Sequence, residues 1–133
     1  MVTKEGLLEG VADLLTALGV ADVSDVLLDF VAGSTMERIR NKINSDEIPD
    51  DLYHMCVRVT TGELLRALYD SGALDIEGLD FSAAVSKIQE GKVDITLASG
   101  SGTMTADQKA NALISALTEM DLDEIYRHRR LVW

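Results

Sequence analysis

The chain has 133 residues and a formal net charge of −11, because 23 acidic residues outnumber 12 basic ones. A surface this negative repels phosphate backbones, which argues against general nucleic-acid binding. Apolar residues make up 47% of the chain and charged residues 26%, a balance that excludes wholesale disorder and fits a single domain spanning residues 1–133.

The first part of the chain predicts two amphipathic helices. Apolar residues recur at helical spacing over residues 7–18, with Thr3 as a start signal and Gly19 as a stop signal. A second helix begins at Asp22 or Ser24, either of which can cap it. The apolar face of this second helix comprises Leu27, Leu28, Val31, Ile39 and Ile43.

A third helix is predicted to follow a break in the pattern. Pro49, Asp50 and Asp51 suit a first helical turn, where carboxylates meet the positive end of the helix dipole. The apolar stripe of this helix comprises Leu52, Met55, Cys56, Val59, Leu65 and Leu68. Gly72 is expected to end it in a left-handed conformation. Gly62 costs roughly 1 kcal/mol of helix propensity in its middle, so we expect it to permit the close approach of another helix.

The periodicity changes in the second half of the chain. Residues 81–91 suggest a short helix ending at a glycine, and then Val93, Ile95 and Leu97 alternate with polar residues, as in a half-buried strand. Residues 99–104 are rich in glycine and serine and predict a flexible loop. A lone strand must pair its backbone groups, either in a local hairpin or with a neighbouring subunit.

The last long helix begins at a capping box formed by Thr105 and Gln108. A short final turn starts at Asp121, and residues 127–133 form a basic tail with an aromatic tip. The predicted fold class is therefore mainly α. We expect a small bundle of about four to five helices, with one short β-strand or hairpin before the last long helix.

Candidate metal sites in this sequence lack ligands. Asp50 and His54 stand four residues apart, as do Glu124 and His128, and that spacing can aim two ligands at one metal, but neither pair has a third partner nearby. The acidic cluster at residues 46–51 lacks the alternating ligands and central glycine of a calcium loop. Solvated helix faces explain these residues, so no metal is expected.

Candidate catalytic and nucleotide sites are equally incomplete. Cys56 lies on an apolar stripe, and His54, two residues away on the same helix, points in a different direction and cannot serve as its base. The loop with Gly100 and Gly102 lacks the Gly-Lys-Ser/Thr ending that holds nucleotide phosphates. The sequence predicts no enzyme and no cofactor. It also lacks a secretory signal or an apolar stretch long enough for a membrane span, so a soluble protein is expected.

Three stretches of the sequence, taken in order, form a pattern of motifs. The first is a helix, an asparagine-containing break and an Ile-Pro helix start over residues 39–49. The second combines Gly62-Glu63-Leu64-Leu65 with Gly72-Ala73-Leu74. The third is a Lys-Ile-x-x-Gly turn that enters the alternating strand over residues 85–97, and it is joined by the closing Tyr126-Arg127 and Trp133.

In their order and spacing, these three stretches resemble the connector proteins of tailed bacteriophages, which are also called adaptor or head completion proteins. The resemblance implies a ring-forming homo-oligomer, commonly dodecameric, that docks beneath the portal and continues the channel of the genome. Its expected partners are further copies of itself, the portal protein and a tail or stopper protein, while genomic DNA passes without specific binding. It implies a location at the head-tail junction of the virion, and in the host cytoplasm during assembly. No catalysis and no membrane are implied.

The predicted subunit or portal interface combines the strand, the loop and the tail. Exposed aromatic and arginine side chains are frequent interface anchors, although a tail can also pack within its own molecule. The interface residues are Val93, Ile95, Leu97, Gly100, Ser101, Gly102, Tyr126, Arg127, Arg129, Arg130 and Trp133.

The alternative function is an acidic regulatory or carrier module that binds a basic protein or a small molecule, with Ser71 as the attachment point of a carrier.

Overall fold

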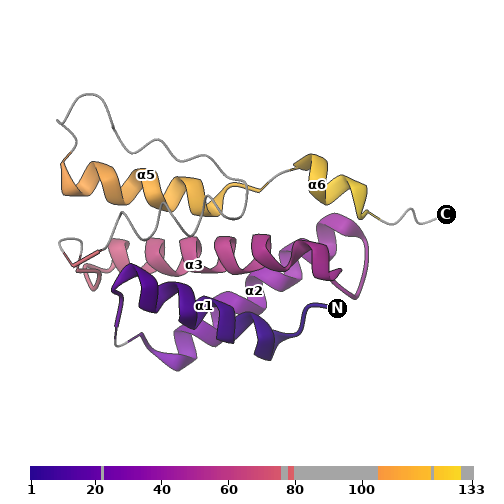
Figure 1. Ribbon diagram of the computed structural model, residues 1–133, viewed down its shortest axis with the longest axis horizontal. Helices are drawn as coiled ribbons and strands as arrows, with labels where there is room; N and C mark the ends of the chain where they lie inside the picture. Colours follow the sequence, from indigo (N-terminus) through magenta and orange to yellow (C-terminus); the bar gives the residue numbers. More distant parts are fainter. Residues whose placement is uncertain (22, 76–77, 80–104, 121, 130–133) are drawn as a thin grey trace.

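The computed structural model describes residues 1–21, 23–75, 78–79, 105–120 and 122–129, and most of these residues lie in helices (Figure 1). The elements are α1 (Lys4–Leu18), α2 (Asp25–Ile43), the 3-10 turn η1 (Asp50–Leu52), α3 (Tyr53–Asp70), α5 (Ala106–Thr118) and α6 (Leu122–Arg127). The prediction of a mainly helical fold is confirmed.

The predicted strand and loop cannot be compared with this structure. The described ranges contain no strand. Val93, Ile95 and Leu97 lie outside those ranges, as do the short helix expected over residues 81–91 and the loop expected over residues 99–104. The strand or hairpin therefore stays a prediction.

The first two helices begin and end at the signals in the sequence. The Thr3 side chain accepts a hydrogen bond from the backbone N–H of Gly6 at 3.1 Å, and Ser24 accepts one from Leu27 at 3.4 Å. Of the two candidate caps, Asp22 and Ser24, it is therefore Ser24 that caps α2. Gly19 ends α1 with a φ of 80°, a left-handed conformation that costs glycine little.

The third helix also ends as expected. Gly72 has a φ of 77°, and its N–H donates to the carbonyl of Tyr69 at 3.1 Å. The next N–H, of Ala73, reaches back to the carbonyl of Leu68 at 2.9 Å, which completes a Schellman motif. At the other end, the expected first turn is a tighter 3-10 turn, η1, before the α-helix begins.

Helix α3 is the central element of the bundle. Figure 1 shows α5 on one side of α3, and α1 and α2 on the other, and α3 contacts all three. The apolar faces of α1, α2, α3, α5 and α6 meet in one core. Its largest fully buried side chains include Leu7, Leu18, Ile39, Ile43, Leu64, Leu65, Leu113, Leu117 and Ile125. Burial of such residues contributes about 1.5–3 kcal/mol each to folding.

Helices α3 and α5 approach each other closely at Gly62, which is buried. A Cβ atom at this position would lie 2.7 Å from Leu117 Cβ and 3.0 Å from the backbone nitrogen of Thr118. These are atoms close to or within the α5 backbone, which cannot rotate away. The expectation that Gly62 permits the approach of another helix is confirmed, and the partner is α5.

A second glycine contact joins α1 to α3, and the sequence analysis did not anticipate it. Tyr53, the first residue of α3, donates a hydrogen bond from its hydroxyl to the carbonyl of Gly6 at 2.9 Å. A Cβ at Gly10 would collide with that hydroxyl and would lie 2.8 Å from Val57 Cγ2. Because Gly6 and Gly10 are one turn apart, the Tyr53 ring lies directly against the α1 backbone.

Two mid-helix glycines should respond oppositely to alanine. Gly62→Ala should lower the free energy of unfolding by about 1–3 kcal/mol, because overpacking against α5 outweighs the gain in helix propensity. Gly33→Ala is the matched control in α2, where the nearest atom to an added Cβ is Lys4 Nζ at 3.8 Å. It should raise the free energy by about 0.5–1 kcal/mol. Urea titrations measure both, and a Gly62→Ala protein at least as stable as the parent would contradict the tight crossing.

Candidate interaction surface

Only part of the predicted interface falls within the described structure. Tyr126, Arg127 and Arg129 are described, and all three are exposed. The remaining interface residues lie outside the described ranges, namely Val93, Ile95, Leu97, Gly100, Ser101, Gly102, Arg130 and Trp133. The candidate surface is therefore built from α6 and the two residues that follow it.

Helix α6 is held on the bundle by one buried side chain. The helix has six residues, too few for stability in isolation. Ile125 is fully buried, and α6 packs against α2. This inward anchor leaves Leu122 and Tyr126, one turn apart, 48% and 55% exposed. We call Leu122, Tyr126, Arg127 and Arg129 the α6 surface.

The segment that follows α6 is tied back to the body of the protein. His128 Nε2 lies 3.9 Å from Asp51 Oδ2, an ion pair when the imidazole is protonated. Arg129 places its guanidinium carbon 6.0 Å from the centre of the Tyr126 ring, within the range of a cation–π contact. The α6 surface thus presents an aromatic ring and cationic groups to solvent, on a protein that is acidic overall.

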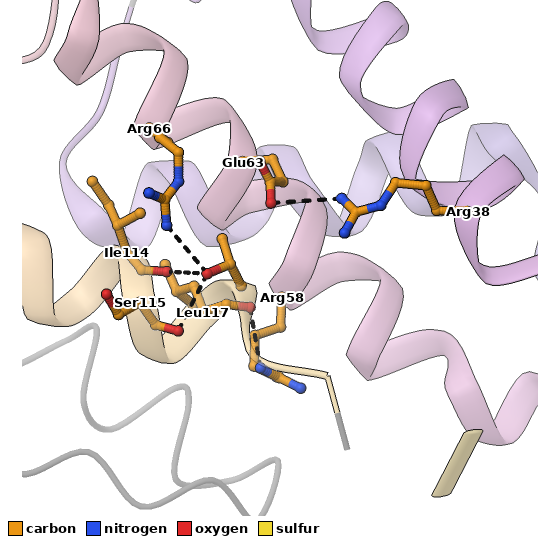
Figure 2. Close-up of polar contacts among 8 residues, drawn as sticks. Arg38, Arg58, Glu63, Arg66, Ile114, Ser115 and Leu117 are labelled. Atoms are coloured by element: carbon orange, nitrogen blue, oxygen red, sulfur yellow. Dashed lines mark hydrogen bonds and ion pairs between the residues drawn. The ribbon is translucent and has the colours of Figure 1, made fainter. Parts of the chain in front are cut away.

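A polar cluster joins α3 to the carboxyl end of α5 (Figure 2). Arg58 Nη1 donates hydrogen bonds to the carbonyls of Ala116 at 2.9 Å and Leu117 at 3.1 Å. Both carbonyls belong to the last turn of α5, which has no basic residue of its own. A cation from α3 therefore satisfies acceptors that the helix leaves open and opposes the negative end of its dipole.

Weaker contacts surround this cluster in Figure 2. Arg66 Nη2 lies 3.5 Å from the hydroxyl oxygen of Thr118, and that hydroxyl donates to the carbonyl of Ile114 at 2.9 Å. Glu63 pairs with Arg38 of α2 at 3.6 Å. These contacts connect α2, α3 and α5 on the protein surface. They cross-link the three helices of the bundle.

Cys56 is fully enclosed between helices. Burial raises the pKa of its thiol to about 12, although the charge of Arg40 acts in the opposite direction. The thiolate, which is the nucleophilic form, is therefore scarce at neutral pH. His54 is exposed while Cys56 is buried. The prediction that Cys56 behaves as a small buried hydrophobic residue is confirmed.

One member of each candidate metal pair, Asp50 in the first and His128 in the second, has another partner. Asp50 Oδ1 lies 2.6 Å from the amino group of Met1, and the imidazole of His128 faces Asp51. Over the ranges that the structure describes, no three His, Cys, Asp or Glu side chains gather as metal ligands. In the same ranges, none of the helices has the length and apolar composition that a bilayer crossing requires.

Two exposed apolar side chains near the start of α2 were not anticipated. Val26 is 81% exposed and Phe30 is 72% exposed. They lie one helical turn apart, away from the face that the sequence analysis assigned to the core. Asp25 and Asp29 stand beside them in the sequence and are also exposed. We call Val26, Phe30, Asp25 and Asp29 the α2 surface.

Comparisons with known proteins do not assign this chain to a family. Searches against family models, curated proteins and solved structures return no match.

The burial of Cys56 predicts slow thiol labelling. With a pKa of about 12, only about one thiol in ten thousand is ionised at pH 8. We expect the native protein to react with a disulfide reagent at least about 100-fold more slowly than the urea-unfolded protein. Absorbance of the released thiolate measures both rates without background, because the chain has one cysteine. Equal rates would show that the thiol is accessible.

The contact of Arg58 predicts a measurable loss of stability. Arg58→Ala should lower the free energy of unfolding by about 1.5–3 kcal/mol, because hydrogen bonds from a charged donor are lost. Arg58→Lys should recover only part of this, since an ammonium lacks the planar fork of a guanidinium. Arg66→Ala, at an exposed site, is the matched control and should cost less than about 1 kcal/mol. Similar losses for Arg58→Ala and Arg66→Ala in urea titrations would exclude a special role for Arg58.

Proposed function

We propose that this chain is a structural subunit of the head-tail connector ring of a phage or prophage, joining the portal to the tail. The observation that carries the proposal is the α6 surface. An aromatic ring and arginine side chains stand exposed on a helix that Ile125 anchors to an acidic, helical body. Such groups are the usual anchors of protein interfaces. The motifs over residues 39–97 add the resemblance to connector proteins.

The proposed role needs shape and contacts, and no reaction. A net charge of −11 makes the protein a poor ligand for DNA, because few cations are available to displace counterions from phosphates. A ring of such subunits would let the genome pass without gripping it. The basic groups of the α6 surface would then serve contacts with the portal, with a tail or stopper protein or with other copies.

The finer parts of the proposal concern residues 93–104. In the assembled ring, Val93, Ile95 and Leu97 form a strand that pairs within its own subunit or with a neighbouring one, and the loop with Gly100 and Gly102 orders on docking. Pairing with a neighbour would satisfy the backbone groups of a lone strand. The ring would be assembled in the host cytoplasm and retained at the head-tail junction of the virion.

The carrier alternative has little support at Ser71. Its hydroxyl donates a hydrogen bond to the carbonyl of Leu68 at 3.0 Å, and Ser71 lies where α3 ends. The attachment serine of an acyl carrier protein is expected to open a helix. We therefore do not develop this function further.

Deletion of residues 126–133 tests the proposal. The truncated chain keeps Ile125, so its helical circular dichroism should be preserved and its free energy of unfolding should fall by no more than about 1 kcal/mol from the lost His128 contact. Binding to the portal protein encoded in the same genome should be lost. Co-sedimentation with the portal ring, followed by electron microscopy of particles, measures this.

The matched controls for that deletion are single charge reversals. Arg127→Glu should weaken portal binding, whereas Lys42→Glu, at an exposed site in the last turn of α2, should leave it unchanged. Full portal binding and normal particles with the truncated chain would refute the role of the α6 surface. A source genome without a portal gene would refute the connector function itself.

A further inference from the structure

The α2 surface is an apolar patch that no other residue of α2 covers. Val26 and Phe30 are more exposed than any other large apolar side chain in the described part of the chain. Single exposed apolar residues are common, but two on one helix turn form a site that water solvates poorly. Whatever covers it must supply an apolar or aromatic group at the centre.

The charged residues around this patch indicate which chemical groups a binding partner should carry. Asp25 and Asp29 border Val26 and Phe30 along the helix. Asp29 Oδ1 lies 2.9 Å from Lys4 Nζ, but both side chains are about half exposed, so that pair is weak and readily exchanged. An occupant with cationic groups beside its apolar centre would complement this rim.

The α6 surface has that chemistry. Leu122 and Tyr126 supply exposed apolar and aromatic groups, and Arg127 and Arg129 supply cations next to them. Arg129 lies near the Tyr126 ring, so aromatic and cation form one unit. Within this protein, the α6 surface therefore complements the α2 surface in both polarity and charge.

The two surfaces cannot meet within one molecule. His128 lies close to Asp51, shortly beyond the carboxyl end of α2, and Figure 1 shows α6 beside that end while α2 begins at the far side of the bundle. The α2 helix has 19 residues and is therefore about 28 Å long. Contact between the surfaces requires a second copy of the chain.

We propose that the α6 surface of one copy docks on the α2 surface of another copy. Each copy contacts one neighbour through its α6 surface and another neighbour through its α2 surface. The contact is therefore heterologous, and its repetition gives a closed ring or an open filament. This inference rests on the proposed function and adds to it the contact that joins neighbouring copies. The contact is small, so we expect association of the free protein to be weak and to require high concentration and low salt.

The test uses two variants that each lose one surface. Phe30→Asp removes the α2 surface and keeps the α6 surface, whereas Tyr126→Asp does the reverse. Each variant alone should be monomeric at concentrations where the parent chain associates. An equimolar mixture should form a dimer and stop there, because one intact pair of surfaces remains. Sedimentation velocity over a concentration series measures all four samples.

The control is Asn41→Asp, which adds the same charge at an exposed site further along α2. It should associate like the parent chain, and circular dichroism should be equal for all variants. A parent chain that stays monomeric throughout, or a mixture without dimers, overturns the inference. If Phe30→Asp is monomeric while Tyr126→Asp associates normally, two α2 surfaces pair with each other and the proposed docking is wrong.

Failure of this inference is distinguishable from failure of the proposed function. Portal binding is measured separately on the same proteins. If Phe30→Asp binds the portal and the mixture forms no dimer, the connector function stands and the docking is wrong. If the mixture forms dimers and no variant or parent chain binds the portal, the docking stands and the connector function is wrong.

Discussion

The contact between α3 and α5 at Gly62 is the constraint on which the rest of the bundle depends. The missing Cβ lets the α5 backbone approach closely, and this approach brings the last carbonyls of α5 within reach of Arg58. Apolar packing tolerates small shifts of a helix, whereas two hydrogen bonds to adjacent carbonyls fix its rotation and register. Gly62 permits the short distance between α3 and α5, and Arg58 sets the alignment of α5 against α3.

Much of the helical framework could be predicted from the sequence because it is encoded locally. Caps at Thr3, Ser24 and Thr105 and the left-handed turn at Gly72 depend on neighbouring residues, and the structure has all of them. The partner of Gly62 could not be predicted, because the contacting residues of α5, Leu117 and Thr118, lie more than fifty residues further along the chain. Spacing along one helix shows which face is apolar but does not identify what covers it.

The candidate surface was predicted only in part, for a related reason. Tyr126 and Arg129 stand out by residue type, and the structure places both on the outside. Val26 and Phe30 gave no such signal, because apolar residues near a helix start look like core residues until the packing is known. Arg58 was missed because its acceptors are backbone carbonyls, which leave no trace in side-chain identity.

The glycine contact of α1 has a consequence for the order in which the protein folds. The partner of the Gly6 carbonyl, Tyr53, is 47 residues downstream. A helix the length of α1 is only marginally stable in water before it packs. During synthesis, α1 therefore gains its full support only when the start of α3 has also left the ribosome. The hydrogen bond that fixes α1 to α3 waits for a residue that is made well after α1 itself.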